Sequence, residues 1–570
     1  MRRIHRLAAL AAAATLLAAC NKPPATNDAP LAFAPADTPY AYANLEPVPA
    51  AVTEQWSRPM QDYWPTLFSM YEALLNDAKT GLDERTRKIV VALFDELKTH
   101  GDWNKLRAIG LKPDARMAVY GVGIVPVLRL ELGDAAAFRA EVARVEQAAG
   151  AKLPVARTGD LDYWQVGNDT LAAAIAIEGV HLVVTVLPPK APDSLKQALL
   201  GLTRPAQNLA AAGTLEALAK QYGLSPYGEG YVDFTRLVER LSKPLEGSDA
   251  EFARTLGLPA NAADANCRRE YAEIAQRFPR LTIGAVEMTP QRMAIRSALE
   301  IEPGLAGRIA AAIGAAPGSG DKNVGVFDMN LATPVLKLKD FWLAEAAAIA
   351  AKPYQCASLA SLNASFAASA AKVDVTVPPP LSDLTGVRMS IDRFEYNAAP
   401  GAVPKVASKL LIGSTNPMAA LAMAQLALPA LQKFKVAPDG KAVALPDDAL
   451  PPMMPPVSVA MSANAIALAT GDGESDALPA YLGAPAAPAA PGAMFLRMHF
   501  GGAIYGWMAR SFDTLQAAMP ADGHAHLDEQ KKLFALYEKW LHATEFTLTA
   551  EPNGIVMRQM IELNTVQVSP

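Results

Sequence analysis

The chain is poor in cysteine and in charged residues. Its 570 residues include three cysteines, Cys20, Cys267 and Cys356, and 19% of the residues are charged. After the first twenty residues, no stretch reaches about 18 apolar residues without a charge or a proline, which argues against a second membrane span. The net charge of −5 excludes the basic footprint of a nucleic-acid-binding protein. With 51% hydrophobic residues, we expect a globular protein.

Sequence motifs for catalysis are also scarce. There is no G-x-S-x-G, no H-E-x-x-H and no Walker loop. The signatures S-x-x-K (Ser369 to Lys372), S-x-N (Ser462 to Asn464) and K-T-G (Lys79 to Gly81) of penicillin-binding enzymes are all present. Their order is wrong, because K-T-G precedes the other two. We therefore predict no catalytic residue and no cofactor.

The histidines do not form a convincing metal site. His524 and His526, with Asp522, Asp528 and Glu529 nearby, are better interpreted as a polar loop that caps a helix beginning near Leu527, since acidic residues favour a first helical turn. No metal site is predicted.

Isolated histidines and aromatic residues have structural interpretations. His181 and His499 occur singly in strand patterns and are interpreted as packed or surface side chains. Four aromatic residues near the N-terminus recur at roughly helical spacing, which indicates a docking face: Trp56, Tyr63, Trp64 and Tyr71.

The N-terminus has the pattern of an export signal. Arg2, Arg3 and Arg6 precede Leu7 to Ala19, an uncharged stretch too short to span a bilayer. The run Leu17-Ala18-Ala19-Cys20 resembles the lipobox of bacterial lipoproteins. This resemblance implies cleavage before Cys20, a diacylglycerol on its thiol and acylation of the new N-terminus. Several acyl chains on one residue would anchor the chain permanently to a membrane.

Residues 21–37 are rich in Pro, Ala and small polar residues and are interpreted as a tether. By resemblance to the lipoprotein class, Asn21 rather than Asp after the anchor favours the outer membrane, facing the periplasm, over the inner membrane. In that oxidising compartment Cys267 and Cys356 are expected to form a disulfide, although two buried free thiols are the alternative.

An internal duplication is the main feature of the remaining sequence. Strand 127–132, an Ala-rich helix 135–149 and a hairpin 171–187 are matched by strand 409–412, helix 418–431 and hairpin 457–470. Both copies end in a hairpin, at 280–301 and 545–563. We expect an α+β fold of internally duplicated units, with antiparallel strands and Ala-rich helices packed on one face, after a helical N-terminal segment.

The expected domain limits follow from these patterns. They are a signal peptide 1–19, the lipidated Cys20 and tether 20–37, a helical segment 38–114, a first α+β unit 115–304, a partial or connecting unit 305–404, and a second α+β unit 405–570.

Three functions remain open. The leading hypothesis is a non-enzymatic, lipid-anchored cell-envelope protein with a scaffold or binding role toward other envelope proteins. The alternative is a periplasmic carrier or sensor of an apolar ligand such as lipid, with Met453 and Met454 as an adaptable lip. A third hypothesis is an envelope hydrolase.

Overall fold

Two compact units make up the protein in this computed structural model. The structure describes residues 28–76, 84–99, 103–167, 172–187, 191–246, 249–250, 252–253, 263–395, 405–450, 455–486, 492–517 and 524–564. Unit 1 comprises residues 1–48, 79–230 and 245–260, and unit 2 comprises residues 49–78, 231–244 and 261–570. These limits do not follow the domain limits expected from the sequence. The fold class is α+β, which confirms that prediction.

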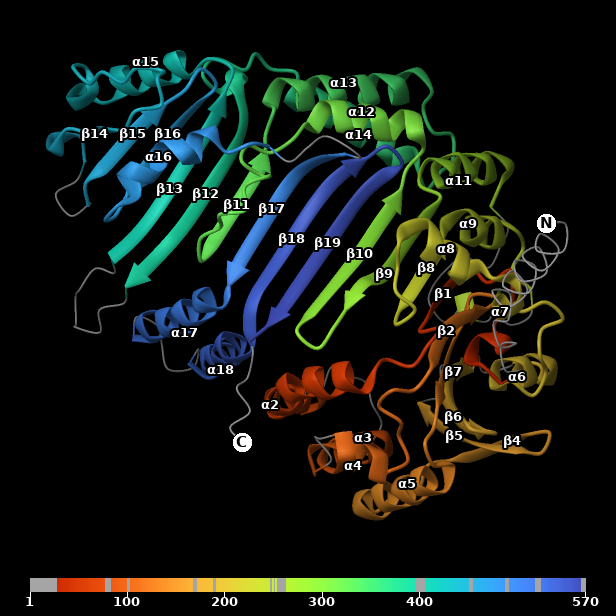
Figure 1. The fold of residues 1–570 in the computed structure, drawn as a ribbon. Helices are drawn as coiled ribbons and strands as arrows, with labels where there is room; N and C mark the ends of the chain where they lie inside the picture. The colour runs from red at the N-terminus through yellow and green to blue at the C-terminus, as the bar shows by residue number, and fades with distance from the viewer. Residues whose placement is uncertain are drawn as a thin grey trace, which may run out of the picture. The chain divides into compact units, whose positions relative to one another are not determined.

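Unit 1 contains an antiparallel sheet with the strand order β1-β2-β3-β7-β6-β5-β4 (Figure 1). Strand β1 also pairs with β8 (Glu229–Asp233). The other elements are η1 (Pro30–Phe33), β1 (Tyr40–Ala43), α3 (Glu84–Thr99), α4 (Trp103–Ala108), β2 (Met117–Val122), β3 (Val125–Glu131), α5 (Ala135–Ala149), β4 (Val155–Thr158), β5 (Leu161–Gly167), β6 (Ala172–Glu178), β7 (His181–Leu187), α6 (Asp193–Leu200), α7 (Leu209–Ala212) and α8 (Thr214–Tyr222).

Helix α5 illustrates how the sequence sets the elements of unit 1. The Asp134 carboxylate accepts hydrogen bonds from the backbone N–H of Ala136 and Ala137 at 2.8 and 3.0 Å and caps the helix start. Gly150 ends the helix at φ 60°, in the left-handed region that favours glycine. The buried Val145 packs with Ile89 of α3. The observed helix therefore has the predicted bounds.

Unit 2 is built on a larger antiparallel sheet with the order β9-β10-β19-β18-β17-β11-β12-β13-β16-β15-β14 (Figure 1). Its elements are α2 (Ala50–Asn76), α9 (Phe234–Ser242), α11 (Ala265–Arg277), β9 (Arg280–Met288), β10 (Arg292–Glu300), α12 (Pro303–Ile313), β11 (Phe327–Ala332), α13 (Val335–Ala351), α14 (Ala360–Val373), η3 (Leu381–Asp383), β12 (Leu384–Glu395), β13 (Lys405–Ser414), α15 (Pro417–Ala427), η4 (Pro429–Leu431), β14 (Val443–Ala444), η5 (Asp447–Ala449), β15 (Val457–Met461), β16 (Ala465–Thr470), α16 (Glu474–Gly483), β17 (Ala493–Gly501), α17 (Gly502–Ala517), α18 (His524–Trp540), β18 (Leu541–Glu551) and β19 (Gly554–Leu563).

Helix α2 runs through Pro59 and Pro65 as one helix, although a proline inside a helix usually kinks or breaks it. Its docking is specific. The Trp56 indole donates a hydrogen bond to the Thr289 carbonyl at 2.9 Å, and Asp62 accepts one from the Trp540 indole at 2.8 Å. These contacts hold α2 against α18 and the β9–β10 turn within unit 2.

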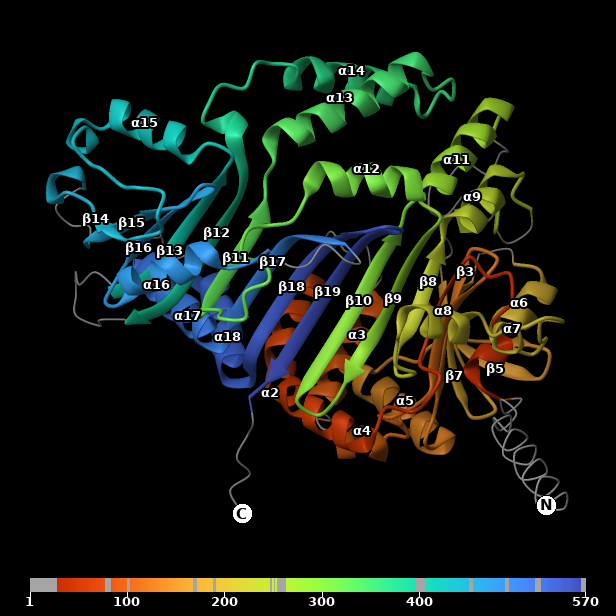
Figure 2. The same ribbon diagram turned by 45° about the horizontal axis from the view of Figure 1, so that its top comes forward.

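Helices cover both faces of the unit 2 sheet, which differs from the expectation of helices on one face. Helix α16 packs on Leu411 and Ala467 through Leu478. Helix α15 packs through Leu421 on the side of Leu468. Successive strand residues point to opposite faces, so α15 and α16 lie on opposite sides of β16. Helices α12, α13 and α14 lie together at one end of the strands (Figure 2).

The order of the elements repeats along the chain. The first repeat runs from η1 to β10 and the second from α12 to β19. Strands β2, β3, β6, β7, β9 and β10 have counterparts in β12, β13, β15, β16, β18 and β19. The range 305–404, expected as a partial or connecting unit, supplies β11 and β12 and so begins the second repeat. Strands β10 and β19 pair antiparallel, Arg292 with Glu562 and Glu300 with Gly554, which relates the two terminal hairpins by a local two-fold axis.

Candidate binding face of the large sheet

Strand register in unit 2 aligns apolar side chains in two rows across five strands. The first row is Leu410, Met389, Met329, Met498 and Phe546 on β13, β12, β11, β17 and β18. The second row is Ile412, Val387, Leu331, Leu496 and Leu548 on the same strands. Residues of one parity share one side of a strand. We call these ten residues the apolar face.

None of the ten side chains of the apolar face is fully buried. The face continues across β19 and β9, where Met557, Leu281 and Ile283 are 38%, 36% and 39% exposed. In the described part of the chain, helices pack against this face at its ends. At one end Leu305 of α12 packs with Leu299 and Ile555. At the other, Tyr505 of α17 stacks on Phe500 with ring centroids 6.5 Å apart.

The opposite face of the same strands carries buried polar groups. Asp328 and Asn330 are fully buried, and Arg388 is 1% exposed. The Arg388 guanidinium donates hydrogen bonds to Asp321 at 3.0 Å and to Asp328 at 3.3 Å. It also stacks on the Tyr481 ring of α16, 4.1 Å from the ring centroid. This network fixes α16 and the segment around Asp321 to the sheet.

Burial also shifts the pKa values of groups on the covered face. Burial raises the pKa of Asp328, and the nearby Arg388 opposes this effect without overcoming it. Burial also raises the pKa of Tyr481. The Lys409 ammonium lies 2.5 Å from Asp392 and 2.6 Å from Glu474. Charges buried to this extent need partners, because desolvation of an isolated ion is costly.

On β11 and β12 the covered face carries buried polar and charged side chains beside the apolar core under α16, while the apolar face is partly exposed. In a one-sided sheet, the apolar side chains are normally buried and the polar ones face water. Here the charged face is closed by α16 and a loop, while the apolar face remains partly open. The ten side chains of the apolar face are intermediate in exposure, so this face is a candidate for contact with an apolar ligand, a membrane or a protein.

A cavity of about 480 Å³ opens in unit 2 near the start of α17. Its polar lining comes from Asp392, Glu538, His542 and Asn564, and glycine backbone forms much of the rest. The Asp392 carboxylate is held by Lys409 at 2.5 Å. Glu538 lies 3.6 Å from Arg510. These partners neutralise both carboxylates of the cavity.

Most residues singled out in the sequence have structural roles. His181 is 2% exposed and packs edge-on to Phe33, with ring centroids 5.5 Å apart. His499 lies on β17, 3.8 Å from Glu545. Ser369 and Lys372 lie on α14 with Lys372 exposed, and Ser462 lies in the β15–β16 turn.

Several predictions fall outside the described residues: Cys20, Lys79 to Gly81, Met453 and Met454, and Asp522. The same holds for the side chains of Tyr71, His524 and His526. Among the described residues, no group of three or more His, Cys, Asp or Glu is placed to hold a metal ion. No helix in the described part of the chain has the length and apolarity needed to cross a membrane.

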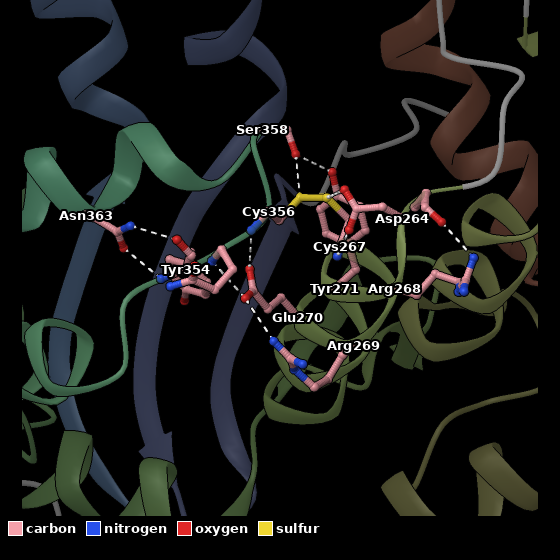
Figure 3. The surroundings of a disulfide bond; sticks show 12 residues. Asp264, Cys267, Arg268, Arg269, Glu270, Tyr271, Tyr354, Cys356, Ser358 and Asn363 are labelled. Atoms are coloured by element: carbon pink, nitrogen blue, oxygen red, sulfur yellow. Dashed lines mark hydrogen bonds and ion pairs between the residues drawn. A yellow bond between two sulfur atoms is a disulfide. The ribbon is translucent and has the colours of Figure 1, made fainter.

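A disulfide joins Cys267 and Cys356 in unit 2, with Cα atoms 4.5 Å apart (Figure 3). Next to it, the buried Glu270 carboxylate accepts hydrogen bonds from the backbone N–H of Gln355 and Cys356 at 2.8 and 2.9 Å. Burial disfavours ionisation, but these two donors and the nearby Arg269 together outweigh it and lower the pKa of Glu270. The carboxylate therefore holds the segment around Cys356 against α11 as an anion.

Comparisons with known proteins provide no relative, since no family model, curated protein or solved structure matches the chain. Sequence reasoning missed the apolar face. The available signal was the alternation of apolar residues in 327–331, 387–391 and 494–500. Such alternation also describes an ordinary core, so sequence alone does not reveal which face stays open.

Proposed function

We propose that the chain is a non-enzymatic, lipid-anchored cell-envelope protein that binds the acyl chains of lipid on its apolar face. The anchor would be the acylated Cys20, and the location the periplasmic side of the outer membrane. The observation that carries the binding proposal is the run of Met389, Met329 and Met498 in register across three strands, partly exposed.

Methionine suits this role because its unbranched side chain is flexible and polarisable, and it adapts to ligands of varying shape. Removal of apolar surface from water contributes about 25 cal/mol per Å². Both rows lack hydrogen-bonding side chains, which favours a ligand part without polar groups. An acyl chain has the length and apolarity to lie along such rows.

Native mass spectrometry of the protein purified from membranes tests both parts of the proposal. Acyl groups attached to Cys20 persist when the collision energy is raised, whereas a lipid on the apolar face dissociates. We expect a covalent mass increase and, in addition, a dissociable lipid-sized adduct. A protein without the dissociable adduct, even after incubation with phospholipid, would contradict the binding proposal and leave the anchor proposal untouched.

The variant Met498→Lys sharpens this test. An ammonium within the rows must lose water when an acyl chain covers it. We expect adduct occupancy to fall about tenfold or more, since each 1.4 kcal/mol changes the affinity tenfold. The control is Val180→Lys in unit 1, where the side chain is 56% exposed in the β6–β7 turn. Equal occupancy in both variants, with both folded by circular dichroism, would exclude the apolar face as the site.

A protein partner is the second candidate occupant, in keeping with a scaffold role. Exposed apolar surface is as typical of protein interfaces as of lipid sites. A partner that co-purifies in place of lipid, and is lost in Met498→Lys, would favour the scaffold function.

A further inference from the structure

Helix α15 has apolar side chains on its inner and outer sides. Its inner residue Leu421 packs with Phe434, Val459 and Met461. On the outer side Met418, Met423 and Leu426 are 52%, 47% and 79% exposed. Leu428, just beyond the helix, is 48% exposed. A helix that is apolar all round is normally buried on all sides, so the outer side of α15 needs an explanation.

Helix α5 is the equivalent of α15 in the first repeat, and its side chains can be compared with those of α15 position by position. Asp134 caps α5, and Asn416 caps α15 by accepting a hydrogen bond from Ala419 N–H at 3.2 Å. Counted from these caps, Glu141 and Arg144 of α5 correspond to Met423 and Leu426 of α15. Glu141 and Arg144 form an ion pair with each other. Glu141 is 5% exposed, whereas Met423 and Leu426 are 47% and 79% exposed, so the second repeat leaves apolar side chains uncovered at these positions.

We infer that the outer side of α15, formed by Met418, Met423, Leu426 and Leu428, lies in the headgroup region of a phospholipid bilayer. Residues 417–431 contain no charged side chain, and the outward residues are Ala, Met and Leu. They carry no aromatic ring and no hydrogen-bonding group, both of which are enriched in protein interfaces. An interfacial helix needs only an apolar side of this kind at the boundary between headgroups and acyl chains.

Charges adjacent to α15 fit this position. Lys433 and Lys435 follow the helix directly and are exposed, so they can reach anionic headgroups. Asp447 and Asp448 lie on η5, which packs against η4, and they partly balance the lysines. The attraction is therefore mainly apolar and only weakly dependent on salt. This inference concerns a surface other than the apolar face and does not depend on ligand binding there.

The test uses the protein with its native anchor, reconstituted in vesicles of phosphatidylethanolamine and phosphatidylglycerol. The variant Leu426→Cys is labelled with an environment-sensitive nitrobenzoxadiazole fluorophore. Cys267 and Cys356 do not react, because they form a disulfide. The matched control is Leu362→Cys on α14, where the native side chain is 37% exposed.

We expect brominated acyl chains to quench the label at position 426 at least about twofold more than the label at 362. Aqueous iodide should quench the label at 362 more than the label at 426. Introducing Met423→Glu and Leu426→Arg recreates the ion pair of α5. With the label at Met418→Cys, this pair of changes should abolish quenching by lipid and leave the melting temperature unchanged. Equal quenching at 426 and 362 would overturn the inference. A label at 426 that brominated lipid does not quench, but that becomes less accessible to iodide as the protein density in the vesicles rises, would also overturn the inference. That result would indicate that a second copy of the chain covers α15.

Discussion

The first and second repeats each bury a cation on the equivalent strand, but they neutralise it differently. In the first, Arg129 of β3 lies 2.8 Å from the partly exposed Glu178, donates to the Leu200 carbonyl at 3.0 Å and stacks on Phe33. In the second, Lys409 of β13 has two carboxylate partners, and Arg388 beside it has two more. The second repeat thus carries a dense ionic network on its covered face.

The ionic network holds α16 and the segment around Asp321 to the sheet through directional contacts. In the first repeat, Glu131 pairs with Arg116 and Lys112, and Tyr120, Val127 and Leu199 are all fully buried. The two repeats therefore differ in how many carboxylates neutralise the buried cation of the equivalent strand.

The largest expected loss of stability comes from replacing the buried arginine of each repeat in turn. Arg388→Met leaves Asp321 and Asp328 without their partner in a buried site, which should cost about 3–5 kcal/mol. In Arg129→Met, the partly exposed Glu178 carboxylate can still be solvated, so the loss in the free energy of unfolding should be about 1–3 kcal/mol. Hydrogen exchange by mass spectrometry, read separately on peptides of β3 and of β12, measures both. A larger loss for Arg129→Met would contradict the comparison.

Reduction of the disulfide should affect only the second of the two units. The bond closes a loop of 89 residues in sequence, and removal of such a bond typically costs about 2–5 kcal/mol. The double variant Cys267→Ser, Cys356→Ser should therefore lower the stability of unit 2 peptides in hydrogen exchange. Peptides of β6 and β7 in unit 1 serve as the internal control. An equal loss in both units would show that they unfold together.

Acid should affect the contributions of His181 in the first repeat and Asp328 in the second in opposite directions. Burial first, and then Arg129, lower the pKa of His181, and Glu178 and Glu131 oppose this less strongly. In the unfolded state, the pKa of the histidine ring is about 6.5. The stability contributed by neutral His181 is therefore fully present above that pH and is lost as the pH falls toward the folded-state pKa. For Asp328, whose pKa is raised, the folded state binds the proton first, so acid adds stability.

The variant His181→Asn isolates this effect. It removes the titrating ring, so the fall in unit 1 stability between about pH 7.5 and 5.5 should become smaller than in the unchanged protein. Urea unfolding followed by hydrogen exchange at the two pH values measures the slope. An unchanged slope in His181→Asn would show that another group controls the acid sensitivity of unit 1.

Much of the local structure could be predicted from the sequence. The hairpin β6–β7 follows from alternation around Gly179, which adopts φ 58°, and β18–β19 follows from the turn at Asn553 and Gly554. Helix α5 follows from its cap residues Asp134 and Gly150. In these cases the signal lies within a few residues of the element it specifies.

Properties that depend on long-range pairing could not be predicted. The apolar face requires β11 to pair with β17, more than 160 residues later in the chain, and no local pattern specifies this. The covered ionic face was missed for the same reason, because Asp321, Arg388 and Tyr481 come from three distant segments. Helix α2 continues through two prolines because tertiary contacts of Trp56 and Asp62 hold it in place.

The most direct test of the account is to map where an acyl chain binds. A long-chain fatty acid with a photoreactive diazirine near its methyl end would be crosslinked to the folded protein and located by peptide mass spectrometry. The account predicts crosslinks concentrated on β11, β12 and β17, around Met329, Met389 and Met498. Crosslinks spread evenly over the surface, or confined to unit 1, would contradict the proposal that the second repeat carries the binding face.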